Sequence, residues 1–449
     1  MIEKNKDRTL VVGLGASGAA AAAFLARRGV QVVATDSSDN ETLRARCEPL
    51  RDLGVEIQLG TENLPTDVSE VVTSPGVPPN RFSAFREAHI PVVGELELGC
   101  REVTAPIIAV TGTNGKSTVV TNIEKGLVAC GLKARALGNL GLPVTRWIEE
   151  NEEVDYLVLE VSSYQLETIA SFKPHIGLIL NVAPDHLSRH QTMEEYVAAK
   201  GRISDNQTIE DVLILHRDLA KWPSLQNTRG RLYWYGRDLD PSLEGLSLGG
   251  SSLTWRGGGG EWSREVSLHG LPDHEIDNLM GAAVVLLEVG VAPEKTVNLF
   301  DAPVRLPHRL EPVGQVRGIR FINDSKATNA HAAIAALRAV EGELLWLVGG
   351  EGKGEDLSDL VSEAIERRPV CIVCFGRDRA IFQKALHDLP VVECCETLSG
   401  AFSLACERAE AGHTILLSPA CASFDEFGSF EERGDAFKSW VAAALEEGT

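Results

Sequence analysis

The chain has 449 residues, and its 43 Lys and Arg against 64 Asp and Glu give a formal net charge of −21. The length exceeds that of one typical domain, and the acidic balance argues against nucleic-acid binding, which needs basic residues to neutralise phosphates. Residues 1–10 contain no long apolar segment, and no apolar run in the chain is long enough to span a membrane. Nine cysteines in a chain of this length do not indicate a disulfide framework. We therefore expect a cytoplasmic protein of two or three domains, without nucleic acid and without membrane insertion.

Residues 9–36 have the pattern of a buried strand, a glycine-rich turn, a helix and a second strand. The turn is GLGASG, Gly13–Gly18, and Asp36 ends the second strand. Glycine lets the backbone turn and approach a pyrophosphate, and the helix N-terminus supplies N–H donors. These residues alone are compatible with NAD binding, with another nucleotide ligand, or with a turn that only packs a Rossmann-like domain.

A second nucleotide motif is VTGTNGKSTVV, Val110 to Val120, which predicts a strand end, a phosphate loop and a helix start. Val110 stands where the usual phosphate-loop pattern has its first glycine. The GK[ST] ending is nevertheless retained at Gly115, Lys116 and Ser117. In such loops the backbone N–H groups surround phosphates, the lysine neutralises them, and the hydroxyl can hold Mg²⁺.

The next two predicted strands end in residues that could hold a metal ion. Glu160 ends YLVLE, and Asn181, Asp185 and His186 lie in the loop after HIGLILNV. Ligands bind at the carboxyl ends of parallel strands, where these residues and the phosphate loop would lie close together. This arrangement predicts a site for a metal ion and phosphate. Taken alone, Glu160 could also be a solvent-facing strand end, and Lys200, on a predicted helix, could be surface charge.

The remaining chain predicts further α/β units. Short strands with glycine-rich turns in residues 243–270 indicate a small antiparallel addition to a parallel sheet. From about residue 306, strands repeatedly lead into loops with polar residues. Cys371 and Cys374 have CxxC spacing, but strand alternation sends them to opposite faces, which favours a buried strand over a metal or redox site. We predict domains at 1–99, 100–305 and 306–449, the first and last Rossmann-like and the central one mainly parallel.

Taken together, these motifs closely resemble the Mur ligase family. GTNGKST, SSYQLE, NVAPDHLSRH, AAKGRI, LPHR, NDSKATN and SPACASFDEF follow one another between residues 111 and 434, and GLGASG and SPGVP extend the match over nearly the whole chain. The phosphate loop without its first glycine is also that family's form. NDSKATN and SPACASFDEF are most similar to the D-glutamate-adding branch. The resemblance implies a central domain like a P-loop ATPase and an ATP-dependent amide ligase of peptidoglycan precursor synthesis.

The resemblance also implies the roles of individual residues. A carboxylate of the nucleotide sugar would take the ATP γ-phosphate, and the amine of glutamate would attack the resulting acyl phosphate. Catalysis would fall to Lys116, Glu160, His186 and Lys200. Mg²⁺ would occupy two sites, held by Ser117 and Glu160 and by His186 and Lys200, the lysine as a CO₂-derived carbamate.

The substrate-binding residues follow in the same way. ATP would contact Gly112, Thr113, Asn114, Gly115, Lys116, Ser117, Thr118, Asn278, His308, Arg309 and Asp324. The nucleotide sugar, UDP-N-acetylmuramoyl-L-alanine, would contact Gly15, Ala16, Ser17, Asp36, Ser37, Ser74 and Asn139, which displaces NAD from the glycine-rich turn. Glutamate would contact Lys326, Thr328, Lys353, Ser423 and Phe430. We expect a monomer.

Four positions depart from the family pattern. Ser38 replaces an arginine expected near the uracil, Ser188 an acidic residue, Glu275 an asparagine before the adenine site, and Phe424 a leucine beside the amino-acid pocket. They leave D-glutamate, L-glutamate and another small dicarboxylate open. An NAD-dependent oxidoreductase and a non-catalytic nucleotide-gated binding protein are the alternatives, and phosphate release that requires both the nucleotide sugar and glutamate would exclude both.

Overall fold

The computed structural model describes residues 8–139, 141–185, 187–258, 260–352, 354, 356–389 and 391–447. Contacts divide the chain into two compact units. The first unit comprises Met1–Val182, Thr192–Leu268 and Asp277–Ala302, and the second comprises Ala183–Gln191, His269–Ile276 and Pro303–Thr449. In the described residues, no helix combines the length and hydropathy needed to cross a membrane.

The first unit contains a five-stranded, fully parallel sheet in the order β3-β2-β1-β4-β5. Its strands are β1 (Arg8–Val12), β2 (Gln31–Asp36), β3 (Glu56–Leu59), β4 (Glu70–Thr73) and β5 (Val92–Gly94). The accompanying helices are α1 (Ala16–Arg27), α2 (Glu41–Asp52), a 3-10 turn at Pro79–Phe82, α3 (Ser83–Glu87) and α4 (Glu95–Cys100). Alternation along β1 separates two cores, because Val11 packs with α1 and α2 whereas Leu10 and Val12 pack with Phe82 and Phe85.

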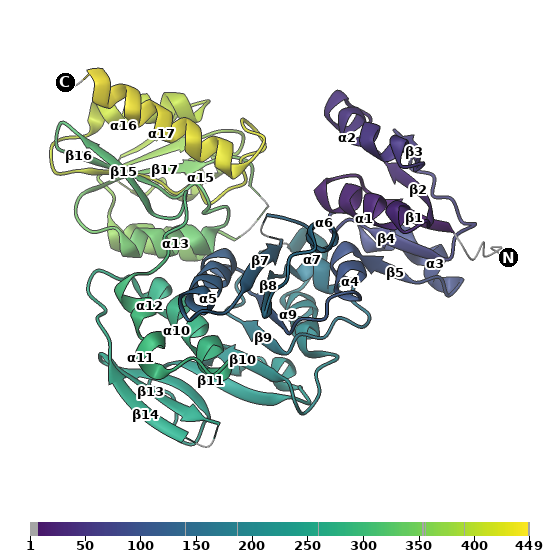
Figure 1. Ribbon diagram of the computed structural model, residues 1–449. Helices are drawn as coiled ribbons and strands as arrows, with labels where there is room; N and C mark the ends of the chain where they lie inside the picture. The colour runs from purple at the N-terminus through teal and green to yellow at the C-terminus, as the bar shows by residue number, and fades with distance from the viewer. Residues whose placement is uncertain are drawn as a thin grey trace. The chain divides into compact units, whose positions relative to one another are not determined.

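The same unit holds a nine-stranded sheet in the order β14-β13-β12-β11-β10-β9-β6-β8-β7 (Figure 1). Its strands are β6 (Ile107–Thr111), β7 (Ala134–Gly138), β8 (Tyr156–Glu160), β9 (Ile176–Ile179), β10 (Val212–His216), β11 (Arg231–Arg237), β12 (Gly245–Gly249), β13 (Ser252–Gly257) and β14 (Gly260–Glu265). Neighbouring strands from β7 to β12 are parallel, and β12, β13 and β14 are antiparallel. The predicted small antiparallel addition is therefore confirmed.

The helices in this part of the chain are mostly short. They are α5 (Lys116–Ala129), α6 (Val144–Glu150), α7 (Ser163–Leu166), α8 (Leu187–His190), α9 (Met193–Gly201), α10 (Asp273–Glu288), α11 (Pro293–Thr296) and α12 (Asn298–Asp301), with 3-10 turns at Arg202–Ser204, Arg217–Lys221 and Pro223–Gln226. Residues of α8 and the start of α10 belong to the second unit by their contacts. Buried Val, Ile and Leu fill β6, β8, β9 and β10, as expected of strands covered on both faces.

The second unit contains a six-stranded sheet in the order β15-β16-β20-β17-β18-β19, parallel except for the β15 edge. Its strands are β15 (Glu311–Val316), β16 (Ile319–Asn323), β17 (Leu344–Gly349), β18 (Cys371–Phe375), β19 (Val392–Cys394) and β20 (Thr414–Leu417). Its helices are α13 (Ala330–Ala339), α14 (Ser358–Arg367), α15 (Arg379–Ala385), α16 (Leu398–Arg408) and α17 (Phe430–Glu447).

Helices cover both faces of this sheet, with α13 on one side and α16 and α17 on the other (Figure 1). The cysteines of β18 follow the predicted alternation, since Cys374 packs with the α13 side and Cys371 with the α16 and α17 side. Both thiols are buried, and burial raises the pKa of each. The prediction of a buried strand is confirmed.

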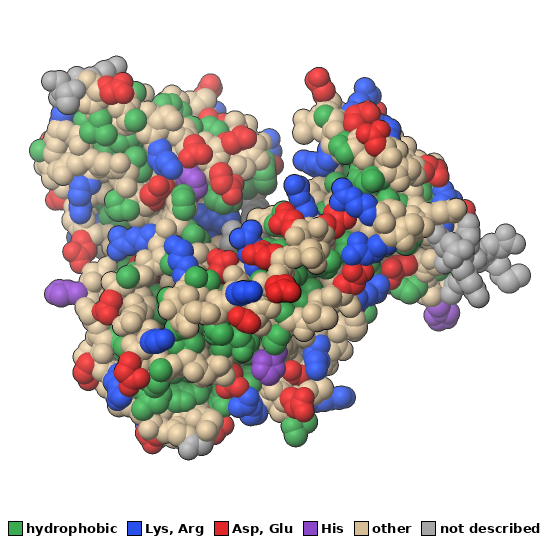
Figure 2. All heavy atoms as spheres, in the orientation of Figure 1, with side chains coloured by type: hydrophobic (Ala, Val, Ile, Leu, Met, Phe, Trp, Pro, Cys, Tyr) green, Lys and Arg blue, Asp and Glu red, His purple; other side chains and the backbone are tan. Residues whose placement is uncertain are grey.

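The α/β fold class with mainly parallel sheets is also confirmed. The predicted domain limit after residue 99 falls inside α4, and the contact-based units join residues 1–99 to most of the central region. On the face drawn in Figure 2, acidic and basic side chains are interspersed, and neither sign forms a broad area.

Candidate active site

The phosphate loop follows β6, which lies between β8 and β9. β7 and β8 lie on one side of β6 and β9 lies on the other, so β6 is at a topological switch point of the parallel sheet. β6 ends at Thr111 and α5 begins at Lys116, as predicted. Gly115 has a φ of +85°, and a β-carbon there would lie 2.2 Å from the Oδ1 of Asn278. Only glycine fits this position, so the loop presents the N-terminus of α5 as a site for an anion.

Lys116 folds back over the loop that precedes it. Its Nζ donates to the carbonyl oxygens of Gly112 at 2.8 Å and Thr113 at 2.9 Å. These bonds hold the ammonium group beside the first turn of α5, which also contains Ser117, 6% exposed. The ammonium group of Lys116, the hydroxyl of Ser117 and the positive end of the α5 dipole thus lie close together, where they could bind an anion.

Asn181, in the segment after β9, holds the phosphate loop in place. Its Oδ1 accepts from the backbone N–H groups of Thr113 at 3.1 Å and Asn114 at 2.9 Å, and its Nδ2 donates to the Asn114 carbonyl at 3.1 Å. The backbone N–H of Thr113 also donates to the Asn181 carbonyl. The sequence placed Asn181 near the site but did not indicate this supporting role, because nothing in its spacing reveals a partner 67 residues away.

Glu160 ends β8 and is only 3% exposed. Its Oε1 accepts from the Nδ2 of Asn139 at 2.7 Å, while its Oε2 is buried without a hydrogen-bond partner among the described residues. Leaving a buried carboxylate oxygen unpaired is costly, and carboxylate oxygens are the ligands that Mg²⁺ prefers. The donor set at Glu160 therefore fits a divalent cation.

Lys200 lies at the end of α9 and is 1% exposed. Its Nζ lies 4.3 Å from the ring centroid of Tyr196, whose hydroxyl is 3.2 Å from the Oγ1 of Thr113. Burial excludes the surface-charge interpretation of Lys200, and the tyrosine connects α9 to the phosphate loop. The described residues contain no cluster of three or more His, Cys, Asp or Glu side chains able to hold a metal ion, but the predicted metal ligand His186 lies outside those residues.

The glycine-rich turn is organised by Asp36, at the end of β2. Its carboxylate accepts from the backbone N–H of Leu14 at 2.7 Å and of Ser38 at 2.9 Å. Ser74 contributes a third bond, from its hydroxyl to the carbonyl of Gly13 at 2.7 Å. Asp36 and Ser74, two predicted ligand residues, therefore have a structural role in shaping the turn.

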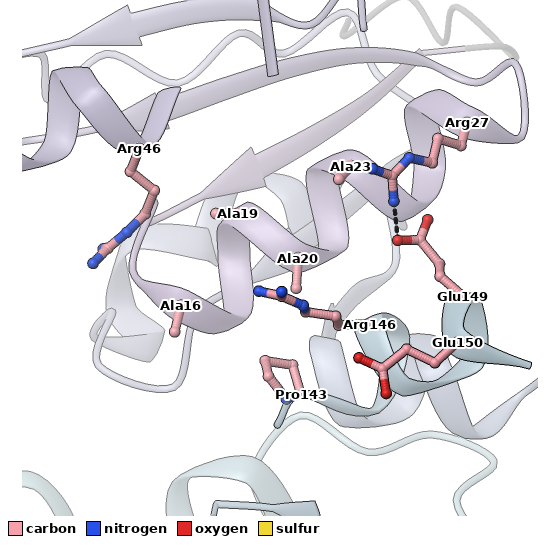
Figure 3. Close-up of a pocket in the computed structure, with 10 residues that line it drawn as sticks. All are labelled: Ala16, Ala19, Ala20, Ala23, Arg27, Arg46, Pro143, Arg146, Glu149 and Glu150. Atoms are coloured by element: carbon pink, nitrogen blue, oxygen red, sulfur yellow. Dashed lines mark hydrogen bonds and ion pairs between the residues drawn. The ribbon is translucent and has the colours of Figure 1, made fainter. Parts of the chain in front are cut away.

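A cavity of about 580 Å³ lies beside α1 and includes Ala16 of the glycine-rich turn (Figure 3). Arg146 of α6 runs alongside α1 below Ala20, and Arg46 of α2 lies on the other side of Ala16. Arg46 also donates to the carbonyl of Leu14 at 3.2 Å. The cavity thus brings two guanidinium groups close to the predicted nucleotide turn, a feature with no sequence motif.

In the second unit, Asp324 follows β16 and is 8% exposed. Its carboxylate accepts from the hydroxyl of Ser418 at 2.8 Å and from the backbone N–H of Leu310 at 3.2 Å. Burial raises the pKa of Asp324 to about 7. His308, 6% exposed, is held through its Nδ1, 3.0 Å from the Nδ2 of Asn323, and burial lowers its pKa.

Two predicted amino-acid-binding residues, Lys326 and Phe430, are in contact in the same unit. The Nζ of Lys326 lies 3.6 Å from the ring centroid of Phe430, and Ser423 is 3% exposed on the loop after β20. Thr328 is half-buried, and Phe424, the departure beside Ser423, is 68% exposed. Lys353 lies outside the described residues.

Family models match most of the chain. Residues 7–94 match "Mur ligase MurD-like, N-terminal domain", residues 110–286 match "Mur ligase middle domain", and residues 308–421 match "Mur ligase, glutamate ligase domain". A UDP-N-acetylmuramoylalanine–D-glutamate ligase from Koribacter versatilis is 36% identical over 98% of both chains, and one from Pelotomaculum thermopropionicum is 37% identical over 99% of both. The chain belongs to the Mur ligase family. As a Mur ligase it is an ATP-dependent ligase, which confirms the family and the enzyme class predicted from the motifs.

Solved Mur ligases share the fold at low sequence identity. MurF from Acinetobacter baumannii has a TM-score of 0.61 and 16% identity, covering 98% of this chain and 93% of its own. The UDP-N-acetylmuramate-alanine ligase from Thermotoga maritima has a TM-score of 0.60 and 16% identity, covering 98% and 99%. At this identity the likeness supports the fold alone.

Some predicted site residues of this Mur ligase contact one another, and the others are described by their burial. In the first unit, the phosphate loop adjoins Asn278, and Glu160 adjoins Asn139. Asn139, predicted for the nucleotide sugar, thus contacts the predicted metal carboxylate. Glu275 is half-buried, and burial raises its pKa. Gly15, Ala16 and Ser37 are exposed, Ser17 is half-buried in α1, Thr118 is half-buried in α5, and Arg309 is half-buried before β15.

Proposed function

We propose that this Mur ligase joins D-glutamate to UDP-N-acetylmuramoyl-L-alanine in peptidoglycan precursor synthesis, with ATP cleaved to ADP and phosphate. The observation that carries the proposal is the phosphate loop itself, with Lys116 held over the N-terminus of α5. The choice of amino acid is supported by the D-glutamate ligases that match along the full chain.

The reaction proceeds in two balanced steps. An oxygen of the alanyl carboxylate attacks the γ-phosphorus of ATP, forming an acyl phosphate as the bond to ADP breaks. The glutamate amine then attacks the acyl carbon, loses a proton, and the tetrahedral intermediate expels phosphate as the amide forms. Both steps bring anions together, so the enzyme must position them and offset negative charge.

Residues of the phosphate loop meet this demand for ATP. The backbone N–H groups at the start of α5 and the Nζ of Lys116 would contact its phosphates. Ser117 and Glu160 would hold the Mg²⁺ used by the family, which supplies positive charge opposite the phosphate oxygens. The buried Oε2 of Glu160 supports this assignment.

The second predicted metal site and the carbamate on Lys200 remain proposals. A protonated lysine cannot bind Mg²⁺, whereas a carbamate formed from its amine and CO₂ offers anionic oxygens. The nearly complete burial of Lys200 supports modification, because moving an ammonium group from water into the protein interior is costly. ¹³C NMR of protein in ¹³C-bicarbonate should show a carbamate signal that is absent in Lys200→Ala, and a free amine in fully active enzyme would contradict it.

The other ligand assignments are proposed on the same footing. The cavity beside α1 is lined by Ala16, the neighbour of Gly15 and Ser17 in sequence, and by Arg46 and Arg146, which supports a diphosphate at this turn. Asn278, His308, Arg309 and Asp324 would contact adenosine, and Lys326, Thr328, Lys353, Ser423 and Phe430 would contact glutamate. The domain limits 1–99, 100–305 and 306–449, the monomeric state and the cytoplasmic location are likewise retained as predictions.

The direct test is ATP-dependent phosphate release with UDP-N-acetylmuramoyl-L-alanine and, in turn, D-glutamate, L-glutamate, D-aspartate and L-lysine. We expect release only when D-glutamate and the nucleotide sugar are both present. If phosphate is released with the nucleotide sugar and a different amino acid but not with D-glutamate, that amino acid replaces D-glutamate as the proposed substrate. If phosphate is released from ATP when both the nucleotide sugar and the amino acid are omitted, the ligase assignment at this site is contradicted.

Lys116→Ala tests the division of labour between the two loops. It should abolish ligation while leaving nucleotide-sugar binding intact, because the glycine-rich turn lies elsewhere in the first unit. Lys125→Ala is the matched control, since Lys125 is exposed on the same helix. Loss of nucleotide-sugar binding in Lys116→Ala would refute the division.

A further inference from the structure

Arg433 is a buried cation that the proposed mechanism does not use. It lies in the first turn of α17 and is 1% exposed, one of the largest fully buried side chains of the protein. Burial lowers its pKa to about 10, so the guanidinium remains charged at neutral pH. Burying a charge is expensive unless its donors are satisfied, so such a group indicates a specific role.

The guanidinium is satisfied by oxygen atoms from two loops. Its Nε donates to the hydroxyl of Ser325 at 2.9 Å, and its Nη2 donates to the carbonyls of Ser325 at 2.8 Å and Cys421 at 3.0 Å. Its Nη1 donates to the carbonyl of Ala422 at 3.2 Å. None of these four acceptors is a carboxylate, but the nearby charges of Asp425, Glu426 and Asp324 partly oppose the effect of burial on the Arg433 pKa.

The segments tied together by Arg433 are those that carry the proposed amino-acid pocket. Ser325 immediately precedes Lys326, and Ala422 immediately precedes Ser423. The Ser325 hydroxyl also donates to the carbonyl of Phe430 at 2.8 Å. One side chain therefore sets the spacing of the loop after β16, the loop after β20 and the start of α17. Only the planar fork of arginine can donate in these directions at once.

We propose that Arg433 is a positioning residue for the amino-acid pocket, and that its positive charge favours an amino acid with two carboxylates. The identity of the ligand rests on the proposed function. The hydrogen bonds of Arg433 go to the loops that carry Lys326 and Ser423, so it acts by placing these residues and through the electrostatic potential of its charge.

Kinetics of the full-length Arg433→Lys and Arg433→Gln variants test both parts. Each should raise the KM for D-glutamate by about ten-fold or more, because several hydrogen bonds that space the loops are lost. The KM values for ATP and for the nucleotide sugar should stay near those of the parent enzyme. Arg433→Gln should also lose more of the preference for D-glutamate over D-glutamine than Arg433→Lys, which keeps the charge.

Guanidinium rescue separates positioning from a general loss of stability. In Arg433→Ala, millimolar guanidinium chloride should lower the KM for D-glutamate, whereas sodium chloride at equal ionic strength should not. Arg408→Ala is the matched control, because Arg408 is exposed in the same unit, and it should respond to neither salt.

Several outcomes would overturn the proposal. A uniform rise in all three KM values, a fall in kcat alone, or a rescue of thermal stability without a change in the KM for glutamate would reduce Arg433 to a structural role. Failure of every Arg433 variant to fold, with or without guanidinium, would do the same. An error in the proposed function would give a different result, because the unmodified enzyme would then not use D-glutamate as a substrate. In that case the Arg433 variants are compared with the amino acid that the unmodified enzyme does use.

Discussion

Replacing Asn181 by alanine tests whether the phosphate loop depends on a side chain that never needs to touch ATP. The substitution removes three side-chain hydrogen bonds, two from the N–H groups of Thr113 and Asn114 and one to the Asn114 carbonyl. At about 1 kcal/mol net for each bond, the conformation of the loop loses about 3 kcal/mol of support. Since about 1.4 kcal/mol corresponds to a tenfold change, kcat/KM for ATP should fall about 100-fold.

Steady-state phosphate release at saturating nucleotide sugar and glutamate gives kcat/KM for ATP, and calorimetric titration gives nucleotide-sugar binding, which should be unchanged. Asn206→Ala is the matched control, because Asn206 also donates to two backbone carbonyls of the first unit, those of Ala170 and Phe172, away from the loop. A folded Asn181→Ala enzyme with the parent kcat/KM for ATP, or an equal loss in Asn206→Ala, would refute the reasoning.

Three further predictions concern other buried groups. Asp324 has a pKa raised to about 7 by burial, so its contribution to the unfolding free energy is largest at low pH and is lost as pH rises from about 4 to 7; Asp324→Asn should remove this dependence in urea titrations. Burial raises the pKa of Glu97, but hydrogen bonds from the N–H groups of residues 170–172 and from the Ser171 hydroxyl lower the pKa overall. Glu97→Gln should therefore reduce the free energy of unfolding by about 3 kcal/mol at pH 7, and by less as pH falls below the ordinary carboxyl pKa. A β-carbon at Gly18 would lie 1.8 Å from the Gly13 carbonyl oxygen, so Gly18→Ala should abolish nucleotide-sugar binding in a calorimetric titration.

Sequence patterns predicted the features that depend on local chemistry. The strand–loop–helix arrangement around Lys116 and the alternation that buries Cys371 and Cys374 follow from residue type and spacing, and the structure confirms both. Strand order could not be predicted, because hydrophobic periodicity does not say which strand lies beside β6. The burial of Lys200 also escaped residue-level reasoning, because it depends on how α9 packs rather than on its own neighbours in sequence.

The glycine-rich turn, the phosphate loop and the loop at Ser325 are each held in shape by a side chain from another segment of the chain. Sequence motifs therefore locate these loops but do not reveal that supporting role. Asp36 shapes the glycine-rich turn from 22 residues away, Asn181 the phosphate loop from 67, and Arg433 the loop at Ser325 from 108. In each case the backbone N–H or carbonyl groups of a short loop are satisfied by one polar side chain from another segment. A loop that must offer its N–H groups to an anion cannot also satisfy them within regular secondary structure, so an external partner is needed to hold its shape. Substitution of Asn181 or Arg433 should therefore alter ligand affinity without removing a ligand contact.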